Sequence, residues 1–316
     1  MDASAGRLPR RRAPRRLGDL TPLRPRTRRW VTIAAFLAPA LAVLAVFVFV
    51  PMLSALRLSF TDASGFGHEQ FVGLDNYVRV FTDESIVRAM GNTVTYSLIF
   101  TPAAVLFALI LALALNHPRL PLRGVFRTWL FLPFIVSLAV AAFAWQYLLD
   151  PQVGLLNHWL SSFGLRIGNV LQEPFLAMPT VALIAAWKCF PFYMIVFLAG
   201  LQEIPQTLYE AALVDGASAL ARFRHITLPL LGNTTGFVLV IAAIAALQAF
   251  DQIYILTNGG PFRSTQTVVM QIYQSGFRDL ELGFASALSY VLLAATLLLS
   301  LLQFALSGRR AKDAIG

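Results

Sequence analysis

Residues 202–229 read QEIPQTLYEAALVDGASALARFRHITLP, and they separate two long apolar segments of the chain. Pro205 suits the first turn of a helix, because its missing N–H would have no helical partner there. Gly216 suits the end of that helix, because a residue without a Cβ can turn the chain into the left-handed region. A second helix can start at Ala217 and continue until Pro229 breaks or kinks it. The stretch therefore predicts a short helix–turn–helix.

The side chains of this helix–turn–helix suit contact with another protein. Ala211, Ala212 and Ala217 are small enough to let a partner approach closely, and Glu210 and Asp215 offer carboxylates to basic or backbone donors. These residues alone leave two interpretations open. The stretch is either a docking element for a partner protein or an inert linker.

The composition around the loop is that of a membrane protein. Hydrophobic residues make up 57% of the 316 residues and charged residues 13%, against about 45–50% and 25% in an ordinary soluble domain. Lipid is the natural solvent for this excess of apolar surface. Four histidines and one cysteine leave little room for a metal cluster, and we find no catalytic motif and no phosphate-binding loop. Any ATP-driven step would need an ATPase on another chain.

Six segments are long and apolar enough to cross a bilayer as helices, which takes about 20 residues each. The predicted spans are 30–58, 92–115, 128–148, 179–201, 232–251 and 283–306. With the N-terminus inside, 18 Lys and Arg residues fall in cytosolic segments and six in outer segments, while Lys188 lies within a span. Because basic residues favour the cytosolic side, the sequence predicts an all-α membrane protein with six transmembrane helices and both termini in the cytosol.

The first 29 residues carry most of the net charge. They hold ten arginines and two aspartates, which gives +8 out of a total of +9. We expect 1–29 to be a disordered cytosolic tail that orients the first span and contacts anionic lipid. No basic or aromatic domain follows that would make it a nucleic-acid arm. The predicted organisation is this tail, a transmembrane domain over 30–308, and a cytosolic C-terminal tail over 309–316.

The 202–231 loop resembles the EAA loop of bacterial ABC importer permeases. The match has the spacing of that motif at seven positions: Glu210, Ala211, Ala212, Gly216, Ile226, Leu228 and Pro229. In that family the loop forms a coupling helix that sits in a cleft of an ATPase subunit. The resemblance implies the same role for these residues and for Asp215, and it favours docking over an inert linker.

Two further segments resemble the carbohydrate-type members of these permeases, a group that includes the maltose permease MalF and the glycerol-phosphate permease UgpA. They are FVGLDNY at 71–77 and DQIYILTNGGP at 251–261. The resemblance covers roughly 30–308 and implies a type I ABC importer permease fold in a bacterial inner membrane. It implies a second homologous permease subunit, two ATPase subunits that bind ATP and Mg²⁺, and an extracytoplasmic solute-binding protein or lipoprotein. It gives this chain no cofactor, metal or catalytic residue of its own.

Polar residues near the end of span five are candidates for solute contact, because polar groups inside a membrane are costly and often functional. Gln248, Asp251 and Gln252 have the i, i+3, i+4 spacing that places side chains on one face of a continuous helix. The resemblance implies a shallow solute site on spans four and five. Alternatively, Gln248 bridges neighbouring helices.

Lys188 in the middle of span four is a second candidate, because an ammonium there could pair with an anionic phosphate. Its neighbours Trp187 and Phe192 could stack on a sugar or could simply pack. Lys188 and Asp251 could instead pair with each other. The solute expected is a sugar, an oligosaccharide, glycerol 3-phosphate or a glycerophosphodiester.

Three other classes of protein explain less of this sequence. An amino-acid, peptide or metal importer would leave the resemblance of 256–261 to carbohydrate-type permeases unexplained. A channel or ion-coupled carrier acting alone would leave the EAA loop unexplained. A membrane enzyme that used Lys188 and Asp251 as acid and base would need a third catalytic group in the same plane, and none is evident.

Overall fold

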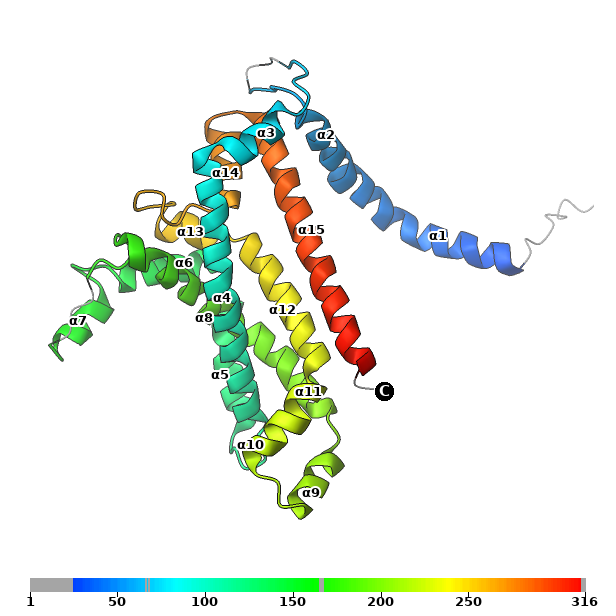
Figure 1. Ribbon diagram of the computed structural model, residues 1–316, viewed down its shortest axis with the longest axis vertical. Helices are drawn as coiled ribbons and strands as arrows, with labels where there is room; N and C mark the ends of the chain where they lie inside the picture. Colours follow the sequence, from blue (N-terminus) through cyan, green and yellow to red (C-terminus); the bar gives the residue numbers. More distant parts are fainter. Residues whose placement is uncertain (1–24, 66, 68, 165–167, 314–316) are drawn as a thin grey trace, which may run out of the picture. The chain divides into compact units, whose positions relative to one another are not determined.

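The computed structural model describes residues 25–65, 67, 69–164 and 168–313, and this part of the chain is helical almost throughout (Figure 1). It contains no β-strand, only an isolated bridge between Thr61 and Phe71. The all-α prediction is therefore confirmed. The chain divides into two units, Met1–Ser54 and Ala55–Gly316.

The first unit consists of the first apolar segment. Helix α1 spans Pro25–Leu44, a π turn follows at Ala45–Phe49, and α2 spans Val50–Leu58 across the boundary between the units. The wide π turn ends two residues before Pro51, whose ring does not fit a regular α turn. The disordered tail predicted over 1–29 is wrong for 25–29, because these residues belong to α1. Pro25 suits a first helical position. Residues 1–24 lie outside the described residues.

Two long helices form the centre of the second unit. They are α4 (Glu84–Asn116) and α8 (Pro174–Glu203), which pack against each other more extensively than any other pair of described helices. Ala104, Ala108 and Ala112 follow each other at intervals of four on α4, and their side chains are fully buried. Such small side chains let two helix backbones approach closely, which is how helices associate where lipid removes the hydrophobic driving force.

Two further helices complete this bundle. They are α12 (Gly232–Leu247) and α15 (Leu282–Asp313); each packs on the other, and α12 also packs on α4. Residues 309–313, which belong to the predicted cytosolic C-terminal tail, continue α15. Arg, Ala and Lys are good helix formers, so nothing in that stretch ends the helix. Residues 314–316 lie outside the described residues.

Four described helices are long and apolar enough to cross a membrane, and two bent pairs bring the number to six if each pair is one span. The first pair is α5 (Arg123–Ile135) with α6 (Leu138–Leu148), bent by 92°. The predicted span 128–148 is therefore not one straight helix. The break follows Pro133, and the Ser137 hydroxyl accepts a bond from the Val140 amide (3.2 Å) that caps α6.

The second bent pair is Ala219–Leu230 with α12, at 66°. α12 begins at Gly232 as predicted but ends at Leu247, so the predicted end of span five at 251 is wrong. The chain leaves the helix over 248–250 and forms the short helix α13 (Asp251–Leu256). The Thr267 hydroxyl donates to the Ala249 carbonyl (3.1 Å), which gives this backbone group at the break a partner.

Short helices lie at both ends of the second unit (Figure 1). α3 (Asp75–Thr82) and α14 (Val268–Tyr273, continued by a π turn at Gln274–Arg278) lie at one end, and α7 (Leu155–Ser161) follows α6. α9 (Gln206–Val214), α10 (Ala219–Arg222), a π turn at Phe223–Thr227 and α11 (Leu228–Leu230) lie at the other end. The 202–231 loop and α3 are thus separated by the length of the bundle.

The end that carries α3 is held by polar contacts from the 71–77 segment. The Asn76 amide donates to the carbonyls of Ser59 (3.0 Å) and Thr61 (2.8 Å). Asp83 caps the N-terminus of α4 by accepting from the hydroxyl and the amide of Ser85, and these bonds hold the pKa of the Asp83 carboxyl below its ordinary value. The resemblance of 71–77 to other permeases thus coincides with a structural role.

Candidate functional site

The 202–231 loop forms the predicted helix–turn–helix, and its turn is a complete Schellman cap. Gly216 has a φ of +74°, in the left-handed region. The Ala217 amide donates to the Ala212 carbonyl (2.8 Å), and the Gly216 amide donates to the Leu213 carbonyl (3.1 Å). A Cβ added at Gly216 would meet open space, so the requirement for glycine comes from the backbone conformation alone.

The second helix of the loop starts and ends close to its predicted limits. Ser218 caps α10 by accepting from the Ala221 amide (3.2 Å), so the helix starts at Ala219. It passes Pro229 through the π turn and ends at Leu230, one residue after the predicted kink. The Tyr209 hydroxyl bonds to the Thr227 hydroxyl (2.9 Å) and ties α9 to this second arm. The two helices are therefore one braced unit.

The predicted coupling residues lie mostly at the surface of the loop. Exposed are Glu210, Ala211, Asp215, Gly216, Leu228 and Pro229, whereas Ala212 and Ile226 are half-buried. Exposed apolar side chains that the sequence argument missed lie beside them: Leu213 (56% exposed), Val214 (89%) and Leu220 (74%). Their signal was present in the sequence, because an apolar pair that ends a polar-flanked helix has no core to enter. We call this exposed tip the knob: it consists of the apolar Leu213, Val214 and Leu220 with the carboxylates of Glu210 and Asp215.

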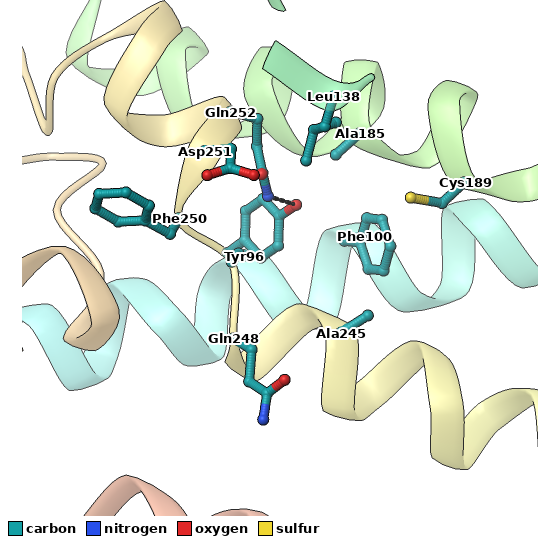
Figure 2. A pocket seen from close by; sticks show the side chains of 11 residues that line it. Tyr96, Phe100, Leu138, Ala185, Cys189, Ala245, Gln248, Phe250, Asp251 and Gln252 are labelled. Atoms are coloured by element: carbon teal, nitrogen blue, oxygen red, sulfur yellow. Dashed lines mark hydrogen bonds between the residues drawn. The ribbon is translucent and has the colours of Figure 1, made fainter. Parts of the chain in front are cut away.

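A pocket of about 220 Å³ lies beside the break between α12 and α13 (Figure 2). Its polar lining consists of Tyr96 on α4, Gln248 in the break, and Asp251 and Gln252 on α13. Apolar groups complete it, among them Phe100, Phe250, Leu138 and Cys189. Gln248, Asp251 and Gln252 are three of the six residues that the sequence predicted to contact solute.

The prediction that these three residues share one helical face is wrong, because α12 ends before Gln248. The Gln252 side chain is buried, and its amide donates to the Tyr96 hydroxyl (2.7 Å). Asp251 is exposed to the pocket, and Figure 2 shows the Gln248 amide on the other side of the Tyr96 ring from Asp251. The break therefore brings the polar groups to one pocket from different directions.

Lys188 is buried, and its ammonium is bound to the backbone of the broken third span. Its Nζ donates to the Phe134 carbonyl (3.0 Å) and lies 4.8 Å from the centroid of the Phe134 ring. Phe134 is in the last turn of α5, where carbonyls have no helical partner. Among the described residues no ion pair joins Lys188 to Asp251, and Lys188 is not one of those that line the pocket. The alternative pairing of these two charges is thus not observed.

Trp187 and Phe192 make aromatic contacts within the bundle. Trp187 meets Trp145 of α6 edge to face at 5.4 Å, and Phe192 stacks on Phe134 at 5.6 Å. Neither is among the described residues that line the pocket. These contacts are the packing interpretation of the two side chains, and contact with solute stays a prediction.

Two aromatic residues of α4 that were not predicted as site residues belong to the pocket. The rings of Tyr96 and Phe100 stack at 5.6 Å, and both line it. A tyrosine inside a strongly apolar segment was the available signal, because its hydroxyl needs a partner in lipid. That partner, Gln252, is 156 positions away in the sequence, so periodicity could not reveal it.

A family model described as "Binding-protein-dependent transport system inner membrane component" matches residues 85–312. The lactose transport system permease protein LacF of Rhizobium radiobacter is 36% identical over 275 residues, which cover 85% of this chain and 91% of LacF. The sn-glycerol-3-phosphate transport system permease protein UgpA of Yersinia pestis is 35% identical over 278 residues, which cover 87% of this chain and 93% of UgpA.

Two solved structures of ABC transporters also contain chains that resemble this one. A chain from the crystal structure of a bacterial ABC transporter involved in the import of the acidic polysaccharide alginate superposes with a TM-score of 0.77 at 28% identity. The match covers 90% of this chain and 96% of that one. A crystal structure of bacterial alginate ABC transporter in complex with alginate pentasaccharide-bound periplasmic protein gives the same TM-score at 27% identity.

Proposed function

Because the chain belongs to the family of binding-protein-dependent transport system inner membrane components, we propose that it forms half of the solute pathway of an ATP-driven importer for a carbohydrate-type solute. The observation that carries the proposal is the braced, exposed knob of the 202–231 loop, with its seven motif positions at the end of the bundle opposite α3. The names of the relatives, a lactose and an sn-glycerol-3-phosphate permease, support the solute class.

The knob is the part of this chain that the ATPase moves. An element that transmits a displacement to the transmembrane helices must be rigid. Three features make the loop rigid: the Schellman cap at Gly216, the bond from Tyr209 to Thr227, and the packing of Ile226 on the bundle. The exposed Leu213 and Val214 offer apolar surface to a cleft. Glu210 and Asp215 offer carboxylates to donors at its rim.

The proposed assembly places the knob in the cytosol. The pair α5 and α6 then forms one span, and α12 without the preceding arm of the loop forms another. With the four long helices this gives six transmembrane helices, with both termini cytosolic in a bacterial inner membrane. Around the transmembrane domain 30–308 we place a second, homologous permease, two ATPase subunits that bind ATP and Mg²⁺, and an extracytoplasmic solute-binding protein. Residues 1–29 would contact anionic lipid.

Transport proceeds by alternating access in this proposal. Closure of the two ATPases on ATP draws the knob and its counterpart on the other permease together, and the pocket opens outward to receive solute. Hydrolysis returns it to the inward state. This chain does no covalent chemistry, because its part is to bind solute weakly and to transmit force.

A tryptophan at Gly216 tests the proposal. In Gly216→Trp the new Cβ meets no atom of this chain within 4 Å, but the side chain strains the left-handed cap and would obstruct a docked partner. We expect ATP-driven uptake to fall at least roughly tenfold, which corresponds to a lost contact of about 1.4 kcal/mol. Uptake into vesicles and the amount of ATPase that co-purifies with this chain are the measurements.

Gly164→Trp is the matched control. Gly164 has the same φ of +74° and equally open surroundings, but it follows α7 and lies outside the loop. Wild-type uptake and ATPase recovery in Gly216→Trp membranes would contradict the proposal. So would purification of the wild-type chain without any ATPase.

A further inference from the structure

The names of the relatives do not distinguish a neutral from an anionic solute, because lactose is neutral and sn-glycerol 3-phosphate is an anion. We infer that the pocket beside the α12–α13 break accepts neutral, hydroxyl-rich solutes and rejects anionic ones. The inference rests on the proposed function and narrows it. It is carried by the charges that face the pocket and by the state of the nearby lysine.

The pocket presents hydrogen-bonding groups and one carboxylate. Asp251 lines it and is exposed, whereas the side chain of Gln248, which also lines it, points away from Tyr96 and Asp251 (Figure 2). A carboxylate accepts bonds from sugar hydroxyls, and the half-buried ring of Phe250 adds an apolar surface that suits the C–H groups of a sugar ring. Within the described residues, no Lys, Arg or His lines the pocket.

The one basic residue that the sequence places within a span is already occupied. The Lys188 ammonium donates to the Phe134 carbonyl at 3.0 Å and covers the Phe134 ring, and the residue is only 8% exposed. To meet an anion in the pocket, Lys188 would have to leave this carbonyl without a partner inside the membrane. Lys188 therefore belongs to the broken span rather than to a phosphate site.

The electrostatic effect of one carboxylate in such a pocket is large enough to discriminate between anionic and neutral solutes. At an effective dielectric constant of about 20, two like unit charges about 8 Å apart disfavour each other by a factor of roughly thirty in binding. A phosphate ester or a uronate beside Asp251 meets this penalty, whereas a neutral saccharide does not. The second permease faces the same pathway, so the test must measure the potential in the pocket of the complete transporter.

Cys189 makes that measurement possible without knowing the solute. It is the only cysteine in the sequence, and it lines the pocket. The assembled transporter in lipid nanodiscs is treated with a cationic (trimethylammonium) and an anionic (sulfonate) methanethiosulfonate of similar size. The two rates of modification of this chain are followed by mass spectrometry. Their ratio is divided by the ratio for free cysteine in the same buffer.

We expect the normalised ratio of cationic to anionic modification at Cys189 to exceed one. Asp251→Asn should lower this ratio roughly tenfold at low ionic strength. Asp251→Glu keeps the charge and should keep the preference. Glu84→Gln is the control for loss of a distant carboxylate. Its position at the start of α4 is about 18 Å along the helix from Tyr96, by the helical rise per residue, and it should leave the ratio unchanged.

Preference for the anionic reagent, an unchanged ratio in Asp251→Asn, or no reaction with either reagent overturns the inference. ATP-driven uptake of sn-glycerol 3-phosphate by the wild-type transporter would overturn it as well, while uptake of lactose with exclusion of the phosphate ester would support it. None of these results contradicts the proposed function. The proposed function would be contradicted by a different result, namely the absence of any ATPase from the same preparation.

Discussion

Lys188 shows how a single residue in a membrane span is explained by its backbone partner. The third span breaks after Ile135, so the last carbonyls of α5 lack helical donors. In lipid each unsatisfied group costs several kcal/mol, because water cannot replace the missing bond. The ammonium of Lys188 supplies one donor and complements the negative end of the α5 dipole. A buried charge and a buried helix end thus satisfy each other.

Reversal of this charge should destabilise the protein strongly. Lys188→Glu would place a carboxylate against the Phe134 carbonyl and leave two buried acceptors without a donor. The expected loss is about 3–5 kcal/mol, the range for an uncompensated buried charge. Thermal unfolding of the purified protein in detergent measures it. Lys188→Arg keeps the donor and should retain most of the stability; equal stability of both variants would refute the assigned contact.

At the scale of elements, the bundle combines a dry seam with two breaks. The seam is the buried face of α4, which packs mainly on α8 and carries small residues such as Ala104, Ala108 and Ala112 that allow neighbouring helices to approach closely. The breaks fall at Val136 and at 248–250, and each is stabilised by side chains from other elements. The pocket lies at the second break, where α4, α6, α8, α12 and α13 contribute residues.

Overpacking of the seam should be costly on one face of α4 only. Ala108 is fully buried, whereas Ala114 on the same helix is exposed. We expect Ala108→Leu to lower stability by about 1–3 kcal/mol, because the added carbons force α4 and α8 apart. Ala114→Leu should change it by less than about 0.5 kcal/mol. Yields and unfolding temperatures in detergent compare the two; equal losses would contradict the packing of α4 on α8.

The bond between Tyr96 and Gln252 should couple α4 to the second break. Removal of either partner leaves the other buried without a hydrogen bond, at a cost of about 1–3 kcal/mol. We expect Tyr96→Phe and Gln252→Met together to cost less than the sum of the single changes, with a coupling of about 0.5–3 kcal/mol. A double-mutant cycle of unfolding free energies measures this. Strict additivity would show that the two side chains do not interact.

At the scale of the whole molecule, the second unit has two chemically different ends. One end carries the 202–231 loop with its exposed apolar tip, and the other carries α3 and α14. At this second end Asn76 of α3 bonds to the segment after α2, and Asn92 of α4 bonds to the Arg263 carbonyl in the loop before α14. In the proposed function the first of these ends contacts the ATPase and the second faces outward. The pocket lies between these ends, on α4 and the break after α12.

Labelling from the two sides of the membrane checks the proposed orientation. In a Cys189→Ala background, Thr207→Cys places a thiol on the exposed start of α9, and Ser162→Cys places one after α7. An impermeant maleimide should label position 162 in intact cells and position 207 only after permeabilisation, at a ratio of roughly tenfold or more, since a charged reagent does not cross the hydrocarbon core. The opposite pattern would invert the topology and remove the knob from the ATPase.

The sequence by itself determined the features that depend on local chemistry. Proline, glycine and a run of helix formers were enough to predict the two helices of the 202–231 loop and the turn at Gly216, because such signals act within a few residues. The apolar composition likewise predicted a helical membrane protein. The motif spacing pointed to the transport family that residues 85–312 were then found to match.

Only the tertiary structure decided how the spans break and what the polar residues do. Gln248, Asp251 and Gln252 looked like one helical face, yet the chain leaves the helix at 248 because Tyr96 and Thr267 from other elements hold the open backbone and side chains. Lys188 looked available to a phosphate, yet it is bonded to a carbonyl 54 positions away. In a membrane every polar group must find a partner within the protein. Those partners are distant in sequence, so local patterns reveal the need for a bond but not the atom that meets it.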